Sequence, residues 1–270
     1  MAVEKADFSV ADDLLREATK GLLGDRPSIE LKRSGRIGPL VELALASIAY
    51  PDQYRSLTVS SPFAMNLSAA LRNRRHFGSG FKDVAGAFPL DVINPVTSDA
   101  PDWDLWTKHA ENIAISMGLN RPLLASLLGA LGELQDNVYE HSGAPETGVV
   151  AYAVTSTSFE FVVADRGVGA LKSLRQNPQY AEVADDGEAL QLAITDGVSR
   201  FQEGGRGRGF RQLFRALVGH AAELRFRSGD HALMLRPGAD ANIATSALSQ
   251  VAPLDGLTIS VFCNGQSLTS

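Results

Sequence analysis

The chain has 270 residues, of which 44% are hydrophobic and 21% are charged. This composition is that of a globular protein, which excludes a disordered or fibrous chain, and the length allows a sizeable core in one or two domains. The net charge of −6 disfavours broad binding to a nucleic-acid backbone, because such binding requires a basic face.

Cysteine content and hydropathy narrow the class of protein further. The single cysteine, Cys263, excludes an internal disulfide framework and a metal cluster built on thiolates. It lies in the apolar run LTISVFC, so we expect a packed side chain and not a nucleophile. No apolar run approaches the roughly 20 residues that span a bilayer, and the N-terminus lacks the layout of a signal peptide. We therefore expect a soluble, cytoplasmic protein without membrane contact.

The first third of the sequence predicts short mixed elements and no catalytic constellation. We expect helices near residues 37–49 and 64–75 and strands near residues 56–60 and 88–93. Two basic clusters, at residues 32–36 and 72–76, are most simply solvated ends of helices or turns. The stretch NPVTSDAPD at residues 94–102 has the composition of a linker. These features predict a small mixed α/β domain of unknown role in residues 1–98 and a second domain in residues 99–270.

Residues 99–270 predict helices that cover one sheet. A helix is expected at residues 103–117, and a second helix follows Pro122, which suits a first helical turn because it has no amide to lose. Leucines at three- and four-residue spacing give this second helix a buried stripe. We expect a two-layer α/β sandwich with a mixed sheet. The predicted strands are residues 148–155, 159–165, 222–228, 231–237 and 256–263, and further helical segments are residues 188–194 and 210–219.

A polar row on the second helix is the first candidate for chemistry. Glu133, Asn137 and His141 are four residues apart and so lie on one helix face, within roughly 80° of one another. Most such faces are merely solvated. However, a carboxylate can deprotonate water, an amide oxygen can ligate a hard cation, and an imidazole can contact a phosphate.

A second candidate is the stretch DRGVG, residues 165–169, at the end of an apolar strand. An aspartate followed by glycines is commonly only a turn. Alternatively, a buried Asp165 would accept a hydrogen bond from an exocyclic amine such as that of adenine. Gly167 and Gly169 would then allow the backbone to approach a flat ring.

The third candidate, GGRGRGF at residues 204–210, leads directly into a periodic helix. Glycine-rich amides before a helix form an anion site. The stretch lacks the Lys-Ser or Lys-Thr of a P-loop, and its G-x-G-x-G spacing differs from the dinucleotide fingerprint. An RNA-binding arginine–glycine segment would lie in a disordered tract, and it fits poorly with an acidic chain.

In this order and spacing, the three stretches resemble the N, G1 and G2 boxes of the GHKL ATPases. That superfamily comprises DNA gyrase, the ninety-kilodalton heat-shock chaperones, histidine kinases and MutL. The segment LAITDGVSRFQEGGRGRGF is similar to the ATP lid of histidine-kinase-like modules and of the related anti-sigma-factor kinases. The resemblance covers about residues 100–265 and implies a Bergerat-type ATP-binding fold.

The resemblance also implies roles for individual residues. Glu133 corresponds to the acid that activates water or a hydroxyl, and Asn137 to the asparagine that binds Mg²⁺ beside the phosphates. His141 stands at a phosphate contact. Asp165 corresponds to the adenine-reading aspartate, with Gly167 and Gly169 lining the base. The residues that correspond to the phosphate-wrapping lid are Gly205, Arg206, Gly207, Arg208 and Gly209, and the two arginines point either to phosphate or to solvent.

Two functions of different class remain open from the sequence. One is an Mg-ATP-dependent phosphotransferase or slow ATPase that regulates a partner protein. The other is a non-catalytic switch in which ATP orders the lid and exposes or buries a partner surface. No histidine has the helical setting of the phosphoacceptor in a complete sensor histidine kinase; His109 comes nearest. The sequence does not name the partner, and it leaves open whether the chain forms a homodimer.

Overall fold

The fold is a five-stranded sheet with helices on both faces. The computed structural model describes residues 3–5, 7–21, 30–32, 36–54, 61–80, 82–90, 101–194, 222–237 and 244–264. The strand order is β3-β4-β5-β7-β6, and every neighbouring pair is antiparallel. The strands are β3 (Ala85–Pro89), β4 (Val149–Thr155), β5 (Ser158–Ala164), β6 (Ala222–Pro237) and β7 (Ala244–Asn264).

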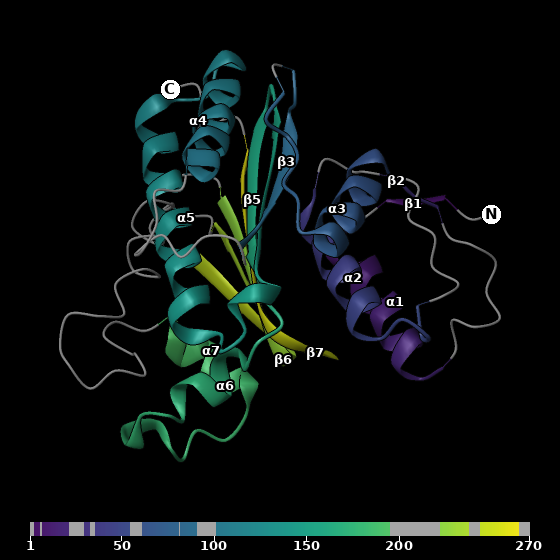
Figure 1. Cartoon of the computed structure of the whole chain (residues 1–270). Helices are drawn as coiled ribbons and strands as arrows, with labels where there is room; N and C mark the ends of the chain where they lie inside the picture. The colour runs from purple at the N-terminus through teal and green to yellow at the C-terminus, as the bar shows by residue number, and fades with distance from the viewer. Residues whose placement is uncertain are drawn as a thin grey trace.

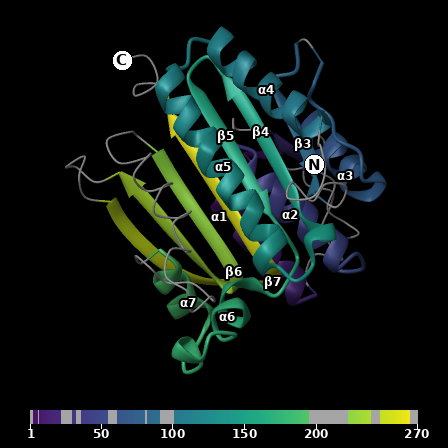
Figure 2. The same cartoon turned by 60° about the vertical axis from the view of Figure 1, so that its left-hand side comes forward.

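Helices form a layer on each side of this sheet, as Figure 1 and Figure 2 show. On one side lie α4 (Pro101–Ser116) and α5 (Arg121–His141), with the short α6 (Gly169–Leu174) and α7 (Asp186–Ala193) at one end. On the other side lie α1 (Phe8–Thr19), α2 (Gly38–Ala49) and α3 (Pro62–Asn73). Two three-residue strands, β1 (Val3–Lys5) and β2 (Glu30–Lys32), pair in parallel apart from the main sheet.

The mixed α/β class is confirmed, whereas the predicted mixed strand direction is wrong. All pairings within the described five-stranded sheet are antiparallel, so the sheet is not mixed. The physical reason is local: a two-residue turn joins β4 to β5, and β6 pairs with the strand that follows it in the chain. The helices of residues 101–194 lie on one face of the sheet, as the two-layer prediction for residues 99–270 has it, while α1, α2 and α3 of the N-terminal segment cover the second face.

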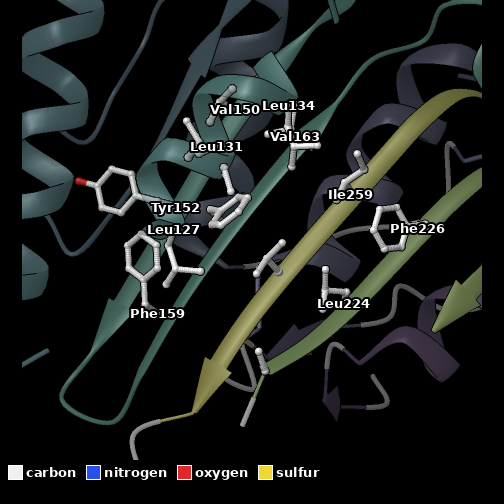
Figure 3. Packing of buried hydrophobic residues seen from close by; sticks show 14 of the residues in the cluster. Leu127, Leu131, Leu134, Val150, Tyr152, Phe159, Val163, Leu224, Phe226 and Ile259 are labelled. Atoms are coloured by element: carbon white, nitrogen blue, oxygen red, sulfur yellow. The ribbon is translucent and has the colours of Figure 1, made fainter. Parts of the chain in front are cut away.

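Helix α5 holds the first core cluster against the sheet. Asn120 caps its N-terminus by accepting a hydrogen bond from the Leu123 amide at 3.1 Å, and Pro122 lies in its first turn. The predicted leucine stripe is buried, as Figure 3 shows for Leu127, Leu131 and Leu134 opposite the sheet. Burying each leucine stabilises the fold by about 1.5–3 kcal/mol, so packing and not propensity holds the helix.

The second core cluster joins residues from both sides of the predicted domain boundary. Strand β3 pairs with β4 and so belongs to the same sheet as residues 149–264. Its Ala87 is buried in one cluster with residues of α1, α2, β4 and β5. The boundary residues 94–100 lie outside the described residues. The described N-terminal helices therefore have no core separate from the sheet.

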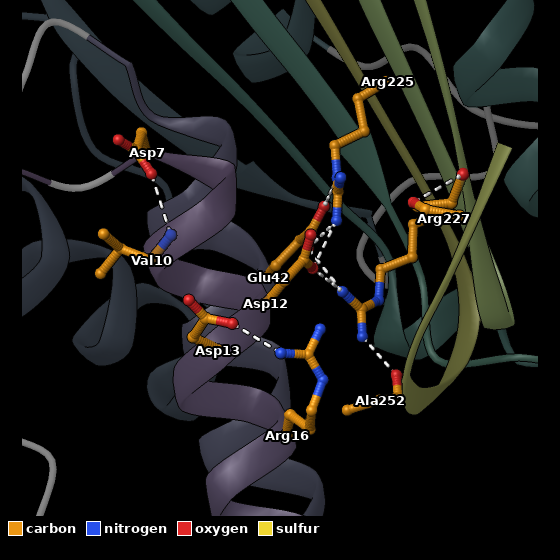
Figure 4. Close-up of polar contacts among 11 residues, drawn as sticks. Asp7, Val10, Asp12, Asp13, Arg16, Glu42, Arg225, Arg227 and Ala252 are labelled. Carbon is orange, nitrogen blue, oxygen red and sulfur yellow. Dashed lines mark hydrogen bonds and ion pairs between the residues drawn. The ribbon is translucent and has the colours of Figure 1, made fainter. Parts of the chain in front are cut away.

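Part of the second face is charged and nevertheless buried. Arg225 and Arg227 project from β6 and are 4% and 1% exposed. Figure 4 shows them converging on Asp12 of α1 and Glu42 of α2. Arg225 Nε lies 2.9 Å from Glu42 Oε1 and Arg227 Nη1 lies 2.9 Å from Glu42 Oε2, while Arg225 Nη2 lies 2.6 Å from Asp12 Oδ1. Two carboxylates thus balance two guanidinium groups in this four-charge cluster.

A buried carboxylate on β5 caps helix α2 from the sheet. The helix has no side-chain cap of its own at Ile37. Instead, Glu160 accepts hydrogen bonds from the amides of Ile37 and Gly38 at 2.6 and 3.0 Å, across 123 and 122 residues of sequence. Ser260 Oγ also donates to Glu160 Oε1 at 3.0 Å. Burial raises the pKa of Glu160 although Arg36 and these donors lower it. A negative charge at a helix N-terminus stabilises the amides there.

Most predicted elements have counterparts in the described residues. The helix near residues 37–49 is confirmed as α2, and the one near residues 64–75 is confirmed as α3 with an earlier start. Helix α1 was not predicted, and the strands predicted at residues 222–228 and 231–237 form one strand, β6, with a register shift between them. The strand predicted at residues 56–60 and the helix at residues 210–219 lie outside the described residues.

Two other sequence inferences can be compared with the structure. Cys263 is buried in the core, as expected, and burial raises the pKa of its thiol to about 12. Within the part of the chain that the structure describes, no helix combines the length and the apolar character needed to cross a bilayer.

The four-charge cluster predicts a large stability loss for Glu42→Gln. Burial alone would raise the pKa of Glu42, but Arg225 and Arg227 outweigh it and lower that pKa below 4.5. The carboxylate therefore stabilises the fold above pH 4.5, and its contribution is lost as pH falls through the lowered pKa. We expect the free energy of unfolding at pH 7 to fall by about 3–5 kcal/mol, with a smaller gap in acid.

Asp13→Asn is the matched control, because Asp13 pairs with Arg16 on the exposed side of α1. It should cost less than about 1 kcal/mol. Urea unfolding at pH 7 and below pH 4.5 measures both variants. Equal losses for the two would contradict a structural role for the cluster.

Candidate functional site

The predicted polar row lies on the face of α5 beside the buried stripe. Glu133 is exposed, and Asn137 and His141 are half-buried. The row runs along the helix axis for about 12 Å, at 1.5 Å per residue. His141 Nε2 is 3.9 Å from Glu140 Oε2. The three side chains therefore share one surface, as the spacing predicted.

The surroundings of this row are acidic. Burial first, and then the charges of Glu133 and Glu140, raise the pKa of Asp136 on the same helix. Three carboxylates thus lie within about two turns of α5. An anionic ligand would approach this surface only with its charge neutralised by a cation. Among the described residues, no group of three or more His, Cys, Asp or Glu side chains is arranged to hold a metal ion.

The loop of residues 165–169 packs against the C-terminal end of α5. The amide of Val168 donates to the carbonyl oxygen of Ser142, the residue after α5, at 2.8 Å. A Cβ atom at Gly167 would lie 2.0 Å from the same oxygen, so only glycine allows this contact. The structure thus brings Asp165, Gly167 and Gly169 next to the end of the helix that carries His141.

The glycines of this loop are required by the protein itself. Gly169 has a φ of 73°, in the left-handed region that favours glycine, and a Cβ there would lie 2.8 Å from Ser228 Oγ. Gly167 is required by its contact with α5. The sequence interpretation, in which these glycines admit a flat ring, stays a prediction, and packing within the chain already accounts for both.

In the loop of residues 165–169, the group left for a ligand is the Asp165 carboxylate and not the backbone amides. Protein acceptors take up most of its backbone donors, so it does not form the open nest of amides that binds phosphate. The adenine-reading interpretation is compatible with this arrangement, whereas phosphate binding by this loop is not. The backbone amide nitrogens donate as follows: Asp165 N to Leu257 O at 3.0 Å, Arg166 N to Thr147 Oγ1 at 2.9 Å, Gly167 N to Asp165 Oδ1 at 2.7 Å, Val168 N to Ser142 O at 2.8 Å and Ala170 N to Ser228 Oγ at 2.9 Å.

Asp165 is a buried carboxylate without a basic partner among the described residues. It is 4% exposed, and its Oδ1 accepts a hydrogen bond from the Gly167 amide. Burial raises the pKa of Asp165 to about 6, against the lowering effect of the Gly167 and Leu257 hydrogen bonds. A buried carboxylate with a raised pKa is a candidate for a functional site.

Sequence reasoning missed two hydroxyl groups that hold the loop. Thr147 accepts from the Arg166 amide, and Ser228 accepts from the Ala170 amide. Thr147 carries no sequence signal, because it ends a single 3-10 turn, Pro145–Thr147, between α5 and β4. Ser228 precedes Gly229 in the predicted strand region. A glycine inside a strand often marks a β-bulge, and β-bulges are common beside functional sites, so this glycine is the signal that could have indicated Ser228.

A groove elsewhere on α5 is not part of this arrangement. Its volume is about 320 Å³, and it lies between α4 and α5. None of the predicted site residues lines it, and its charged lining residues all belong to α4. We therefore place the candidate site at the end of β5. The groove residues are Trp103, Asp104, Thr107, Lys108, Glu111, Leu128, Leu131 and Gly132.

The third predicted stretch cannot be placed in this geometry. Residues 204–210 lie outside the described residues, together with the remainder of residues 195–221. The lid roles of Gly205, Arg206, Gly207, Arg208 and Gly209 therefore stay predictions. The described chain ends on one side of this gap at α7 and resumes at β6.

No protein-family model matches the sequence. No curated protein matches it significantly.

The raised pKa of Asp165 predicts a pH-dependent gain in stability for Asp165→Asn. A group whose folded pKa lies above its ordinary value of 3.8 stabilises the fold only while protonated, so this contribution is lost as pH rises from about 4 to about 6. The amide carries no charge and can still accept from Gly167. We expect the variant to gain up to about 3 kcal/mol relative to wild type between pH 4 and pH 7.5.

Chemical unfolding at the two pH values measures this double difference. Because each protein is compared with itself, other titrating groups cancel. A difference between variant and wild type that is the same at both pH values would contradict the buried, unneutralised state of Asp165.

Proposed function

We propose that the chain is a cytoplasmic Mg-ATP-binding regulatory protein whose residues 99–270 form a GHKL-type ATPase domain of Bergerat type. It hydrolyses ATP or transfers the γ-phosphate to a partner protein. One observation carries the proposal: the buried, unneutralised Asp165 lies in a loop packed on the end of α5, the helix that bears Glu133, Asn137 and His141.

Asp165 provides the adenine-recognising group. Its Oδ1 is occupied by the Gly167 amide, so Oδ2 accepts the hydrogen bond from the exocyclic amine of the base. A hydrogen bond to a charged acceptor in a site of low dielectric constant is worth more than one in water. The energetic cost of burying this carboxylate is then offset only when an amine ligand is bound, which gives selectivity for adenine over bases with a carbonyl at that position.

Asn137 and His141 provide the phosphate side of the site. Mg²⁺ is commonly held by one or two protein oxygens together with substrate phosphates. The donor set fits this mode, because Asn137 offers a half-buried amide oxygen on an acidic surface that no bare triphosphate would approach. Mg²⁺ would neutralise phosphate charge there, and His141 would contact a phosphate oxygen. The lid residues 205–209 would complete the enclosure.

Glu133 provides the chemistry. Its carboxylate takes the proton from water or from a hydroxyl of the partner while that oxygen bonds to the γ-phosphorus, and the bond from phosphorus to the bridging oxygen breaks to release ADP. Glu133 is exposed, so its carboxylate is accessible to an attacking molecule. A protein that only switches conformation with ATP has no need of a base at this position.

Asp165→Asn tests the adenine assignment. We expect the affinity for Mg-ATP to fall about 10- to 100-fold, since a hydrogen bond to a charged acceptor is replaced by a neutral contact. Isothermal titration with Mg-ATP and with Mg-GTP measures the change, and the unfolding curve of the variant reports that the fold is retained. Unchanged ATP affinity would remove Asp165 from the site.

Glu133→Ala tests the catalytic assignment. We expect ATP affinity to be retained and turnover to fall about 10²- to 10⁴-fold, the usual contribution of a positioned base. Glu140→Ala is the matched control, because it removes the same charge from the same helix. The assay follows γ-labelled ATP into free phosphate, labelled protein and bound nucleotide, with and without products of neighbouring genes. Wild-type binding without turnover would favour the ATP switch, and absence of binding would refute both functions.

A further inference from the structure

Ser228 lies at the point where the two long strands change register. It pairs with Leu257 on β7, and the register shifts between Ser228 and Gly229. Ser228 is fully buried, at 0% exposure. Its Oγ accepts a hydrogen bond from the Ala170 amide at 2.9 Å and donates one to Asp186 Oδ1 at 3.0 Å. One hydroxyl thus joins β6 to the first turns of α6 and α7.

This position on the strand pair fixes both ends of the Asp165 loop. Leu257, opposite Ser228, accepts the hydrogen bond from the Asp165 amide, where the loop begins. Ser228 itself holds Ala170, immediately after the loop ends. Gly169 is confined between them, because a Cβ there would lie 2.8 Å from Ser228 Oγ and 3.2 Å from the Gly256 carbonyl oxygen. A shift of Ser228 would therefore displace the backbone that orients Asp165.

Asp186 sets the direction of the hydroxyl group. A serine hydroxyl has one proton and two lone pairs. With the proton directed to Asp186, the lone pairs are free to accept from Ala170. Asp186 is itself held over Gly229, which has a φ of 54° and whose Cβ would lie 2.1 Å from Asp186 Oδ2. The carboxylate and the hydroxyl therefore act as one unit.

We infer that Ser228 is a positioning residue for purine discrimination: by holding the Ala170 amide, it keeps the Asp165 carboxylate in line with the 6-amino group of an adenine nucleotide. Asp186 supports it by fixing the hydroxyl direction. The inference rests on the proposed function and adds a specificity role for residues that do not touch the base. A 6-oxopurine nucleotide places a carbonyl oxygen, which cannot donate a hydrogen bond, opposite the same carboxylate. It is rejected only while Ser228 keeps the loop, and so the carboxylate, in this position.

The test compares affinities for Mg-ATP and Mg-GTP by isothermal titration. We expect Ser228→Ala to lower the ATP-to-GTP affinity ratio about tenfold, the equivalent of one hydrogen bond. Asp186→Ala should lower the ratio in the same direction, whereas Asp186→Asn, which keeps an oxygen acceptor, should retain it. The Ser228→Ala and Asp186→Ala effects should not add in the double variant, because both act through one hydroxyl.

Ser260→Ala is the matched control. Ser260 is also 0% exposed and also donates to a carboxylate, Glu160, but on the opposite face of the sheet. It should lower stability and leave the ratio unchanged. A ratio retained in both Ser228→Ala and Asp186→Ala, with selective ATP binding by the wild type, would overturn the inference alone. Failure of the wild type to bind ATP would overturn the proposed function.

Discussion

The fold depends on buried charge on the second face of the sheet. Glu160 on β5 caps α2, and Arg225 and Arg227 on β6 neutralise Glu42 and Asp12. Each charge would be costly to bury alone, so the sheet face and the two helices are complete only together. Apolar packing elsewhere on this face adds stability, while the charged contacts determine where each helix lies on the sheet. The N-terminal helices are therefore part of the sheet's architecture and not an appendage.

The same strands serve the candidate site from their other face or their end. Strand β5 carries Glu160 toward α2 and ends just before Asp165. On β6, Arg227 points to the four-charge cluster, and the next residue, Ser228, holds the loop. Because neighbouring side chains on a strand point to opposite faces, the helix attachment lies directly behind the loop. The position of α1 and α2 and the position of the Asp165 loop thus share one rigid support.

Sequence periodicity correctly predicted those features that depend on residues close together in the chain. The leucine stripe gave α5 and its polar face correctly, because helical period alone determines which residues share a face. Helices α2 and α3 were predicted, but their packing on the second face of the sheet was not, since the cap on α2 comes from Glu160, 123 residues away. Arg36, interpreted as part of a solvated basic cluster, lies 3.5 Å from that carboxylate and is mainly buried. No local pattern distinguishes a charge that pairs across the chain from one that faces water.

The buried carboxylates of Glu42 and Asp165 differ in a way that distinguishes a structural charge from a candidate ligand-binding group. Glu42 is surrounded by guanidinium groups that lower its pKa, so its charge is neutralised within the fold. Asp165 receives only backbone donors, and burial raises its pKa to about 6. Selection for stability alone would favour neutralising or replacing such a group, because its ionisation opposes folding at neutral pH. A strand-end carboxylate kept without a basic partner, in a loop held by two hydroxyls, is better explained by a ligand that supplies the missing donor.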